Sequence, residues 1–195
     1  MPKVTEEYRQ ARRDTIARAA LRVLERKGVH DTSIADIVAE SGLSTGAIYS
    51  HFTSKSELAR YIVAEYLFPR LHELEQSAEV RTPRDVLETM LKVFTDDGLP
   101  TRIVVQFWGE AATGGELRDE MMRTAARLRA TIARALLPWA RTRVGSDASD
   151  AEAEALASER TRAVVALAQG YVAHSAVFGP RDPHEYVDSI VAALT

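Results

Sequence analysis

The chain has 195 residues, a formal net charge of −3, 46% hydrophobic and 27% charged residues, and no cysteine. This length suits one medium domain or a small domain joined to a larger one, and the apolar content is sufficient for a sizeable core. The lack of cysteine excludes disulfides and thiolate metal sites. The N-terminus is polar and no apolar run reaches roughly 18 residues, so we expect neither a signal peptide nor a membrane span. We therefore expect a cytoplasmic protein.

Charge is distributed unevenly along the chain. Residues 1–55 contain nine Lys/Arg and seven Asp/Glu, which leaves 16 basic and 21 acidic residues for the remainder. A mildly basic N-terminal segment on an acidic body favours a protein that touches phosphate groups with one end. A random fluctuation explains a difference of this size about equally well.

Apolar residues recur at helical spacing almost throughout, and alternation typical of strands is nearly absent, so the sequence predicts an all-α fold of about nine helices. The first predicted helix covers about residues 6–26, with Ile16, Ala20 and Val23 on one face, and ends at Gly28. The predicted helix from Ser54 to about Gln76 contains Pro69, where we expect a kink or a break.

Later helices are delimited by caps, glycines and prolines. The residues near 145–155 are the most loop-like in the chain. Three further predicted helices cover about residues 83–96, residues 101–113 before the Gly114–Gly115 pair, and residues 116–137 before Pro138. The last two run from the end of the loop-like segment to Phe178, and from residue 183 to the C-terminal end.

The segment from Thr32 to Lys55 predicts two short helices joined by a tight turn, followed at once by a third helix. Gly42 stands where a left-handed helix ending requires no Cβ, and Ser44 can cap the next helix. That next helix starts with small residues, which allows close approach to a DNA major groove, as in helix-turn-helix proteins. The segment therefore indicates DNA binding.

The motif G-x-S-x-G-x-x-Y-x-H-F-x-S-K within residues 10–60 resembles the TetR family of one-component transcriptional regulators. The segment FWGEAATGGELRDEM and the Gly170–Tyr171 pair are similar to one C-terminal subtype of that family. The resemblance implies a helix-turn-helix DNA-binding domain over residues 1–53 and a helical effector-binding and dimerisation domain over residues 54–195.

The small residues at the start of the second helix of the motif are candidates for sequence-specific contacts to base edges. The polar residues around them are candidates for contacts to DNA phosphates. The predicted DNA-binding residues are Thr32, Ser33, Ser44, Thr45, Gly46, Tyr49, His51 and Lys55. Ser44 and Ser54 also suit simple capping roles, and His51 also suits filling a polar gap beside Phe52. Arg12 and Arg13 suit either solvated surface positions or a basic arm that touches DNA.

A helix-turn-helix unit reads half a site, so we expect a homodimer on a palindromic operator of double-stranded DNA. The resemblance implies that the last two helices form the dimer bundle. Candidate dimer residues are Val164, Ala168, Gly170, Val172, Ser175, Val187, Ile190, Val191 and Leu194, for which burial within one subunit is the alternative.

Large adaptable side chains and a few polar groups gather in the later helices, where the resemblance implies that a small-molecule effector is enclosed. Candidate effector-pocket residues are Phe94, Phe107, Trp108, Glu110, Met121, Met122, Tyr171 and His174, for which an ordinary core is the alternative.

The first hypothesis is a transcriptional repressor released from its operator by a small-molecule effector. The second is a constitutive or partner-controlled DNA-binding regulator without a ligand. The third is a helical enzyme or interaction module, which no nucleophile elbow, phosphate loop or metal-ligand spacing supports. We expect no enzymatic activity, no cofactor and no metal.

Overall fold

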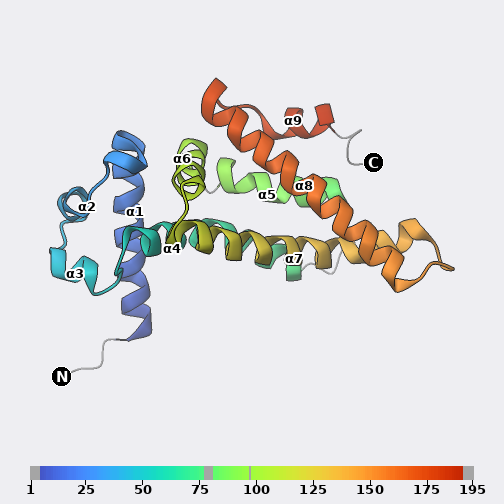
Figure 1. Ribbon diagram of the computed structural model, residues 1–195, viewed down its shortest axis with the longest axis horizontal. Coiled ribbons are helices and arrows are strands. Elements are labelled where there is room, and N and C mark those ends of the chain that lie inside the picture. The colour runs from blue at the N-terminus through green and yellow to red at the C-terminus, as the bar shows by residue number, and fades with distance from the viewer. Residues whose placement is uncertain (1–4, 77–80, 97, 191–195) are drawn as a thin grey trace. The chain divides into compact units, whose positions relative to one another are not determined.

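The computed structural model describes residues 5–76, 81–96 and 98–190, which contain nine α-helices and no strand (Figure 1). This confirms the all-α prediction. The helices are α1 (Glu6–Asp31), α2 (Ile34–Ser41), α3 (Thr45–Tyr49), α4 (Lys55–Gln76), α5 (Pro83–Thr95), α6 (Thr101–Ala112), α7 (Glu116–Val144), α8 (Asp150–Phe178) and α9 (Pro183–Ile190). Among the described helices, none is both long enough and apolar enough to cross a bilayer.

The chain divides into two compact units. The first unit comprises Met1–Ala64 and Gln106–Glu120, and the second comprises Glu65–Val105 and Met121–Thr195. Helices α4, α6 and α7 each contribute residues to both units. The predicted boundary at residue 53 separates a DNA-binding domain from an effector-binding domain. The two compact units are defined by contacts and do not test that boundary, so it stays a prediction.

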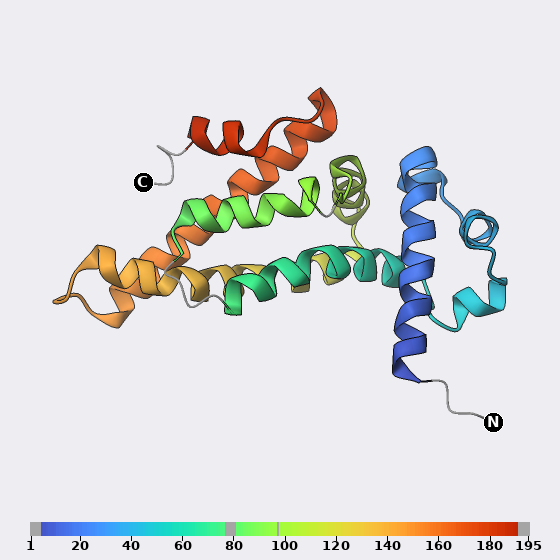
Figure 2. The same cartoon turned by 180° about the vertical axis from the view of Figure 1, so that it is seen from behind.

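In the first unit, α2 and α3 lie on the same side of α1 in both views (Figures 1 and 2). The apolar face of α1 includes Ile16 and Ala20, neither of which retains any exposed surface. Ile37 of α2, Ile48 of α3 and Phe52 are each no more than 1% exposed. Burial of these side chains removes apolar surface from water and holds the three helices in a fixed arrangement.

Helix α1 is interrupted near its end. Gly28 has φ of 81°, a left-handed conformation that separates the long helix from a last turn ending at Asp31. The Thr32 hydroxyl donates a hydrogen bond of 2.6 Å to the Gly28 carbonyl. The predicted end of the first helix at Gly28 therefore corresponds to a real interruption, and one further turn follows it.

Two predicted boundaries in the later helices are wrong. Helix α7 continues through Pro138 to Val144, because the buried neighbours Leu136 and Ala140 hold this segment in the core and tertiary packing outweighs the lost hydrogen bond. Helix α8 starts at Asp150, inside the segment predicted as a loop. Ser149 and Glu152 form a reciprocal capping box there, which offsets the unfavourable composition.

Helix α4 runs through Pro69 without ending there. The expected break is therefore absent from the helix as it is described.

In the second unit, α5 packs against α8 and α9. Its buried face includes Val86, Leu87, Met90 and Leu91, and a Thr82–Asp85 capping box fixes its start. Tyr186 of α9 donates a 2.7 Å hydrogen bond to the Leu167 carbonyl of α8. These contacts join the last helices within one subunit.

Candidate nucleic-acid interface

The turn between α2 and α3 has the geometry that its residues predict. Gly42 has φ of 68°, and its N–H donates to the Val38 carbonyl at 3.1 Å. Ser44 follows in extended conformation, and its hydroxyl accepts the Ala47 N–H at 3.2 Å. A left-handed glycine and a serine cap thus set the direction in which α3 leaves the turn.

Helix α3 presents two different faces. Ile48 is fully buried against the core, whereas Tyr49 is 50% exposed. Thr45 and Gly46 at the start of the helix are also exposed. A Cβ built on Gly46 would meet no atom within 4 Å, so packing inside this protein does not require glycine there. The exposed face therefore offers a small, uncrowded end and an aromatic hydroxyl one turn further on.

The hydroxyls predicted for phosphate contact before α2 are already bonded within the first unit. Thr32 is 2% exposed and donates to Gly28. The N–H and hydroxyl of Ser33 both donate to the Asp36 carboxylate, at 2.9 and 2.6 Å. Side-chain hydrogen bonds from Lys27 and Ser33, in that order, hold the pKa of Asp36 far below its usual range. A negative carboxylate thus occupies this helix start, which opposes phosphate binding through the two hydroxyls.

His51 and Lys55 follow α3 in the chain. His51 is half-buried, and Lys55 is exposed as the first residue of α4. The positive end of the α4 dipole adds to the Lys55 charge. Ser54 accepts the Glu57 N–H at 3.1 Å, as expected for a cap. The Glu57 carboxylate, however, accepts from the N–H and hydroxyl of Thr53, at 2.7 and 2.9 Å, so the predicted capping box closes one residue earlier.

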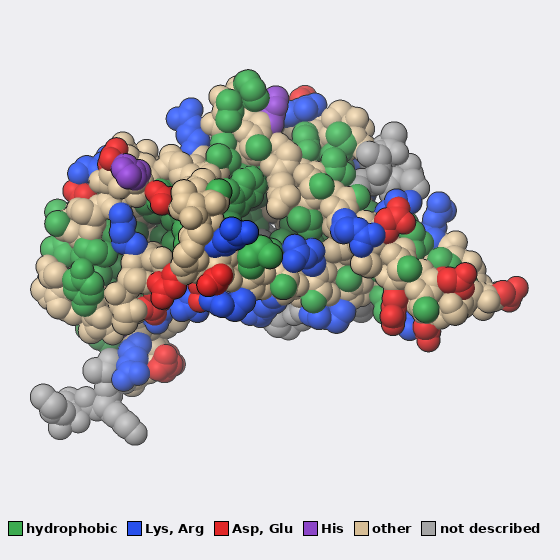
Figure 3. Space-filling model, viewed as in Figure 1, with side chains coloured by type: hydrophobic (Ala, Val, Ile, Leu, Met, Phe, Trp, Pro, Cys, Tyr) green, Lys and Arg blue, Asp and Glu red, His purple; other side chains and the backbone are tan. Residues whose placement is uncertain are grey.

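Three of the seven Lys/Arg side chains of α1 are paired with acids of α2. The Arg22 and Arg26 guanidinium groups each contact the Glu40 carboxylate at 2.6 Å, and Lys27 contacts Asp36 at the same distance. Basic and acidic side chains accordingly lie side by side on the first unit, at the left of Figure 3. These three basic side chains are therefore engaged within the first unit, while the net excess of two basic residues over residues 1–55 stays the same.

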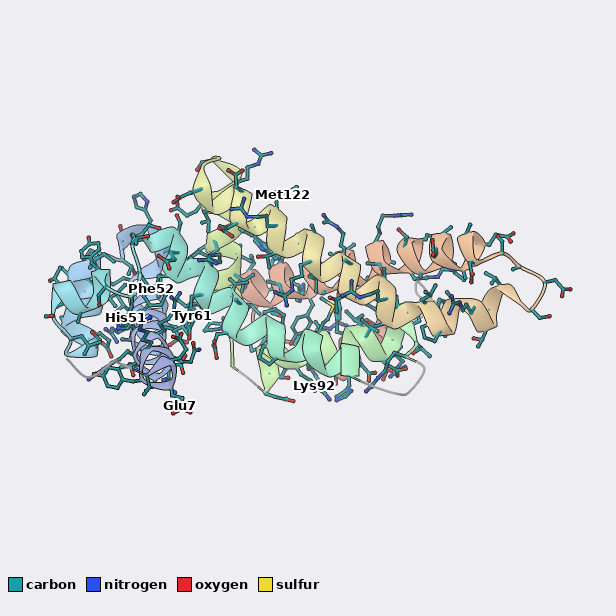
Figure 4. The ribbon with its side chains drawn as sticks, turned by 90° about the horizontal axis from the view of Figure 1, so that it is seen from below. Glu7, His51, Phe52, Tyr61, Lys92 and Met122 are labelled. Carbon is teal, nitrogen blue, oxygen red and sulfur yellow. The ribbon has the colours of Figure 1, made fainter. Side chains whose placement is uncertain are left out.

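Arg13 takes a role that sequence reasoning missed. Its guanidinium lies 4.5 Å from the Phe52 ring centre and 4.7 Å from that of Tyr61, and it contacts Glu57 at 3.5 Å. The two rings meet edge to face at 5.3 Å, as they lie together in Figure 4. Arg13 is therefore held against α4 and does not form a free basic arm.

The predicted effector-pocket residues belong to both units. Phe107, Trp108 and Glu110 are in the first unit, and the other five, Phe94, Met121, Met122, Tyr171 and His174, are in the second. Phe107 and Glu110 line a cavity of about 350 Å³ in the first unit.

In the second unit, the rings of Phe94 and Tyr171 are 6.2 Å apart, and Tyr171 donates to the Arg181 carbonyl at 2.9 Å. Burial raises the pKa of Tyr171. Met121 is half-buried, Met122 is 59% exposed and stands on the surface of α7 in Figure 4, and the exposed His174 lies 5.1 Å from the Phe178 ring. The second-unit residues are thus partly core and partly surface.

The predicted dimer residues are mostly inside the subunit. The buried members are Val164, Ala168, Val172, Ser175 and Val187. Ile190 is half-buried, Gly170 is exposed, and Val191 and Leu194 lie outside the described residues. A Cβ on Gly170 would approach Tyr186 Oη to 3.1 Å, so this glycine accommodates α9 of the same subunit.

The capped turn, the buried side of α3 and its exposed, small N-terminal end define a helix-turn-helix protein. Residues 16–62 match the family described as bacterial regulatory proteins, tetR family. The uncharacterized HTH-type transcriptional regulator YfiR of Bacillus subtilis (strain 168) is 37% identical over 109 residues, which cover 54% of this chain and 53% of that relative. The chain thus spans about half the length of the curated relatives it matches.

The fold is also found in solved structures. Salmonella enterica GusR has a TM-score of 0.69 at 23% identity, with 98% of each chain covered. A TetR transcription regulator from Haloarcula marismortui ATCC 43049 has a TM-score of 0.70 at 17% identity, with 95% of this chain and 96% of that chain covered. Residues 16–62 therefore match the tetR family of regulatory proteins, and the chain shares the fold of a solved TetR transcription regulator.

Proposed function

We propose that the protein is a homodimeric repressor that binds a palindromic operator in double-stranded DNA and is released by a small-molecule effector. The observation that carries the DNA-binding part is the exposed face of α3. Thr45 and Gly46 form its uncrowded end, and Tyr49 extends from the same side with half its surface free.

The contacts divide into base reading and anchoring. Ser44 and Thr45 read base edges through their hydroxyls, and Gly46 lets the backbone approach. Tyr49, His51 and Lys55 anchor α3 to phosphates on both sides of the groove. Ser33 and Thr32 contribute mainly by holding the start of α2, because their hydroxyls are bonded to Asp36 and Gly28.

The dimer surface follows from the exposed side of α8. Small and apolar exposed side chains recur there at helical spacing: Ala166, Ala173 and Val177. Val177 and Phe178 are 66% and 77% exposed, and Figure 3 shows hydrophobic side chains gathered over the end of α8. Pairing this face with its copy buries the patch and lets the partner supply a second α3.

The effector part of the proposal is supported by the aromatic cluster of Phe94 and Tyr171 in the second unit. A ligand shifts the equilibrium between two conformations only if it binds one of them more tightly. An effector that binds more tightly to the conformation with wrongly spaced recognition helices would therefore release the operator. A constitutive or partner-controlled regulator is the alternative, and it predicts DNA binding that no small molecule changes.

The test is selection of binding sites from random duplexes, followed by fluorescence anisotropy with the selected sequence. We expect a palindrome with half-site centres about one helical turn, ~34–36 Å, apart, bound with an affinity that falls steeply as salt rises. Equal affinity for all sequences would contradict a specific regulator. Compounds that raise the melting temperature of the protein are then added to the protein–DNA complex. If the protein is controlled by an effector, at least one of these compounds should lower its affinity for DNA.

A further inference from the structure

A cavity of about 350 Å³ lies within the first unit, and its lining residues include none from α3. Its walls come from α1, α2, α4, α6 and the start of α7. The apolar lining includes Leu24, Ile37, Leu58, Ile62, Phe107 and Leu117. Because each water needs about 30 Å³ in the liquid, this space accommodates a compact molecule of about ten non-hydrogen atoms.

One wall of the cavity is held by a contact between α6 and the last turn of α1. The side-chain oxygen of Gln106 accepts the Val29 N–H at 2.6 Å. A Cβ on Gly28 would lie 3.0 Å from the same oxygen, and the φ of 81° there also disfavours any other residue. The wall thus has a defined position without a ligand, so binding requires little rearrangement.

The charged groups at the rim differ in their exposure. Lys55 and Glu116 are exposed, and the His30 side chain is 92% exposed. Glu110 is the most sheltered of these four groups, with 42% of its side chain accessible. His30 Nδ1 lies 3.8 Å from Glu110 Oε1, which is beyond hydrogen-bond distance. The Glu110 carboxylate is therefore the rim charge whose environment a bound molecule would change most.

We propose that this cavity is a binding site for a small organic cation. Its compact hydrocarbon part lies among Leu58, Ile62 and Phe107, and its ammonium group donates a hydrogen bond to the Glu110 carboxylate. A neutral alcohol of the same size could donate only an uncharged hydrogen bond to this carboxylate, and an anion would be repelled by it. An ammonium group instead forms a charge-assisted hydrogen bond with it. This site is separate from the second-unit cluster assigned to the effector, and its existence does not depend on DNA binding.

Three probes of the same shape test the proposal on the full chain: cyclohexylmethylamine, cyclohexylmethanol and cyclohexanecarboxylate. Titrations at pH 7 are followed by amide NMR shifts of Val29, Ala59 and Leu117. We expect the amine to shift these residues and to bind at least tenfold more tightly than the alcohol, with the carboxylate weakest.

Two variants and a control make the assignment specific. Glu110→Gln should remove the preference for the amine over the alcohol and retain binding of the alcohol. Glu116→Gln, which changes an exposed carboxylate at the same rim, should keep the preference. Ala59→Leu fills the cavity and should abolish binding of all three probes. The proposal is overturned if none of the probes shifts the cavity residues, if the carboxylate binds best, or if Glu110→Gln leaves the preference unchanged.

Discussion

The guanidinium of Arg13 lies 4.5 Å from the centre of the Phe52 ring and connects α1 to the segment between α3 and α4. The centre of the Tyr61 ring lies 4.7 Å from the same guanidinium, and the Tyr61 hydroxyl donates to Asp14 and accepts from Gln10 at 2.6 Å. The segment that follows Phe52 carries Lys55. Arg13 is therefore a positioning residue for the DNA-binding face.

Replacing Arg13 by Gln tests this role. Loss of the partly buried cation–π contacts should lower the free energy of unfolding by about 1 kcal/mol, measured by urea denaturation. The slope of log affinity against log salt should stay the same, because Arg13 does not contact phosphate. Arg12→Gln is the control, since Arg12 contacts only Tyr8 of its own helix in the interactions described. A slope reduced by about one unit with unchanged stability would instead assign Arg13 to a phosphate.

The division of labour on α3 predicts different effects for two neighbouring exposed residues. Thr45→Ala should change which base is preferred at one operator position, since we propose that its hydroxyl reads base edges. Tyr49→Ala should weaken binding to all sequences by a similar factor, because it removes an anchoring contact. Anisotropy titrations against a set of singly substituted operators measure both. Uniform weakening by Thr45→Ala would show that this residue does not read sequence.

The exposed face of α8 predicts the effect of a charge placed in the dimer interface. Ala173→Arg should convert the dimer to a monomer in sedimentation velocity experiments, because two copies of the charge would meet across the symmetry axis without a partner. Ala151→Arg lies on the exposed surface near the start of the same helix and should leave the dimer intact. A dimer that survives Ala173→Arg would place the interface elsewhere.

Gly170 and Tyr186 should show coupled effects on stability. Alanine is favoured over glycine inside a helix by about 1 kcal/mol, but its Cβ would lie 3.1 Å from Tyr186 Oη. Gly170→Ala should therefore gain little in the natural chain and nearly the full ~1 kcal/mol when combined with Tyr186→Phe. A double-mutant cycle of unfolding free energies measures the difference. Equal gains in both backgrounds would mean that Tyr186 does not restrict this position.

Acid should weaken the contact between α1 and α2. Side-chain hydrogen bonds from Arg22 and then Arg26 hold the pKa of Glu40 below its ordinary value in the folded chain. The unfolded state therefore binds more protons at low pH, so this stabilisation is complete above the unfolded pKa of about 4.3 and is lost as pH falls through the folded pKa. Glu40→Gln should make the decrease of the unfolding free energy below about pH 5 shallower.

The control for this comparison is Glu25→Gln, which changes an exposed carboxylate on α1. Both proteins are unfolded by urea at several pH values between about 3 and 7. Because the Glu40 pair lies at the surface, the effect should be modest and should shrink in high salt. Identical pH profiles for Glu40→Gln and the unchanged chain would show that the pair contributes nothing measurable.

The turn between α2 and α3 could be predicted because each of its constraints is local. Gly42 supplies a positive φ and Ser44 supplies a cap within a few residues of where each is needed. The same holds for the caps of α5 and α9, where threonine or aspartate precedes proline. The start of α8 at Asp150 carried a comparable signal in Ser149 and Glu152, but the surrounding small and acidic residues favoured a loop.

Contacts between distant residues could not be predicted in this way. Arg13 meets Phe52 and Tyr61 from another helix, and Val29 meets Gln106 from a position 77 residues later. No spacing in the sequence relates such partners. The predicted effector and dimer residues share this difficulty, because apolar residues of a pocket, an interface and a core follow the same helical periodicity.

The first unit is built from two separate segments of the chain, and this affects when the unit can fold during synthesis on the ribosome. It consists of residues 1–64 together with residues 106–120, which supply Gln106, Phe107 and Glu110. A ribosome synthesises the chain from its N-terminus, so this unit lacks part of its wall until residue 120 of 195 has been added. The helix-turn-helix is thus synthesised well before its unit is complete, and a nascent chain that stops before α6 carries α2 and α3 without the contact from Gln106 to Val29 in the last turn of α1.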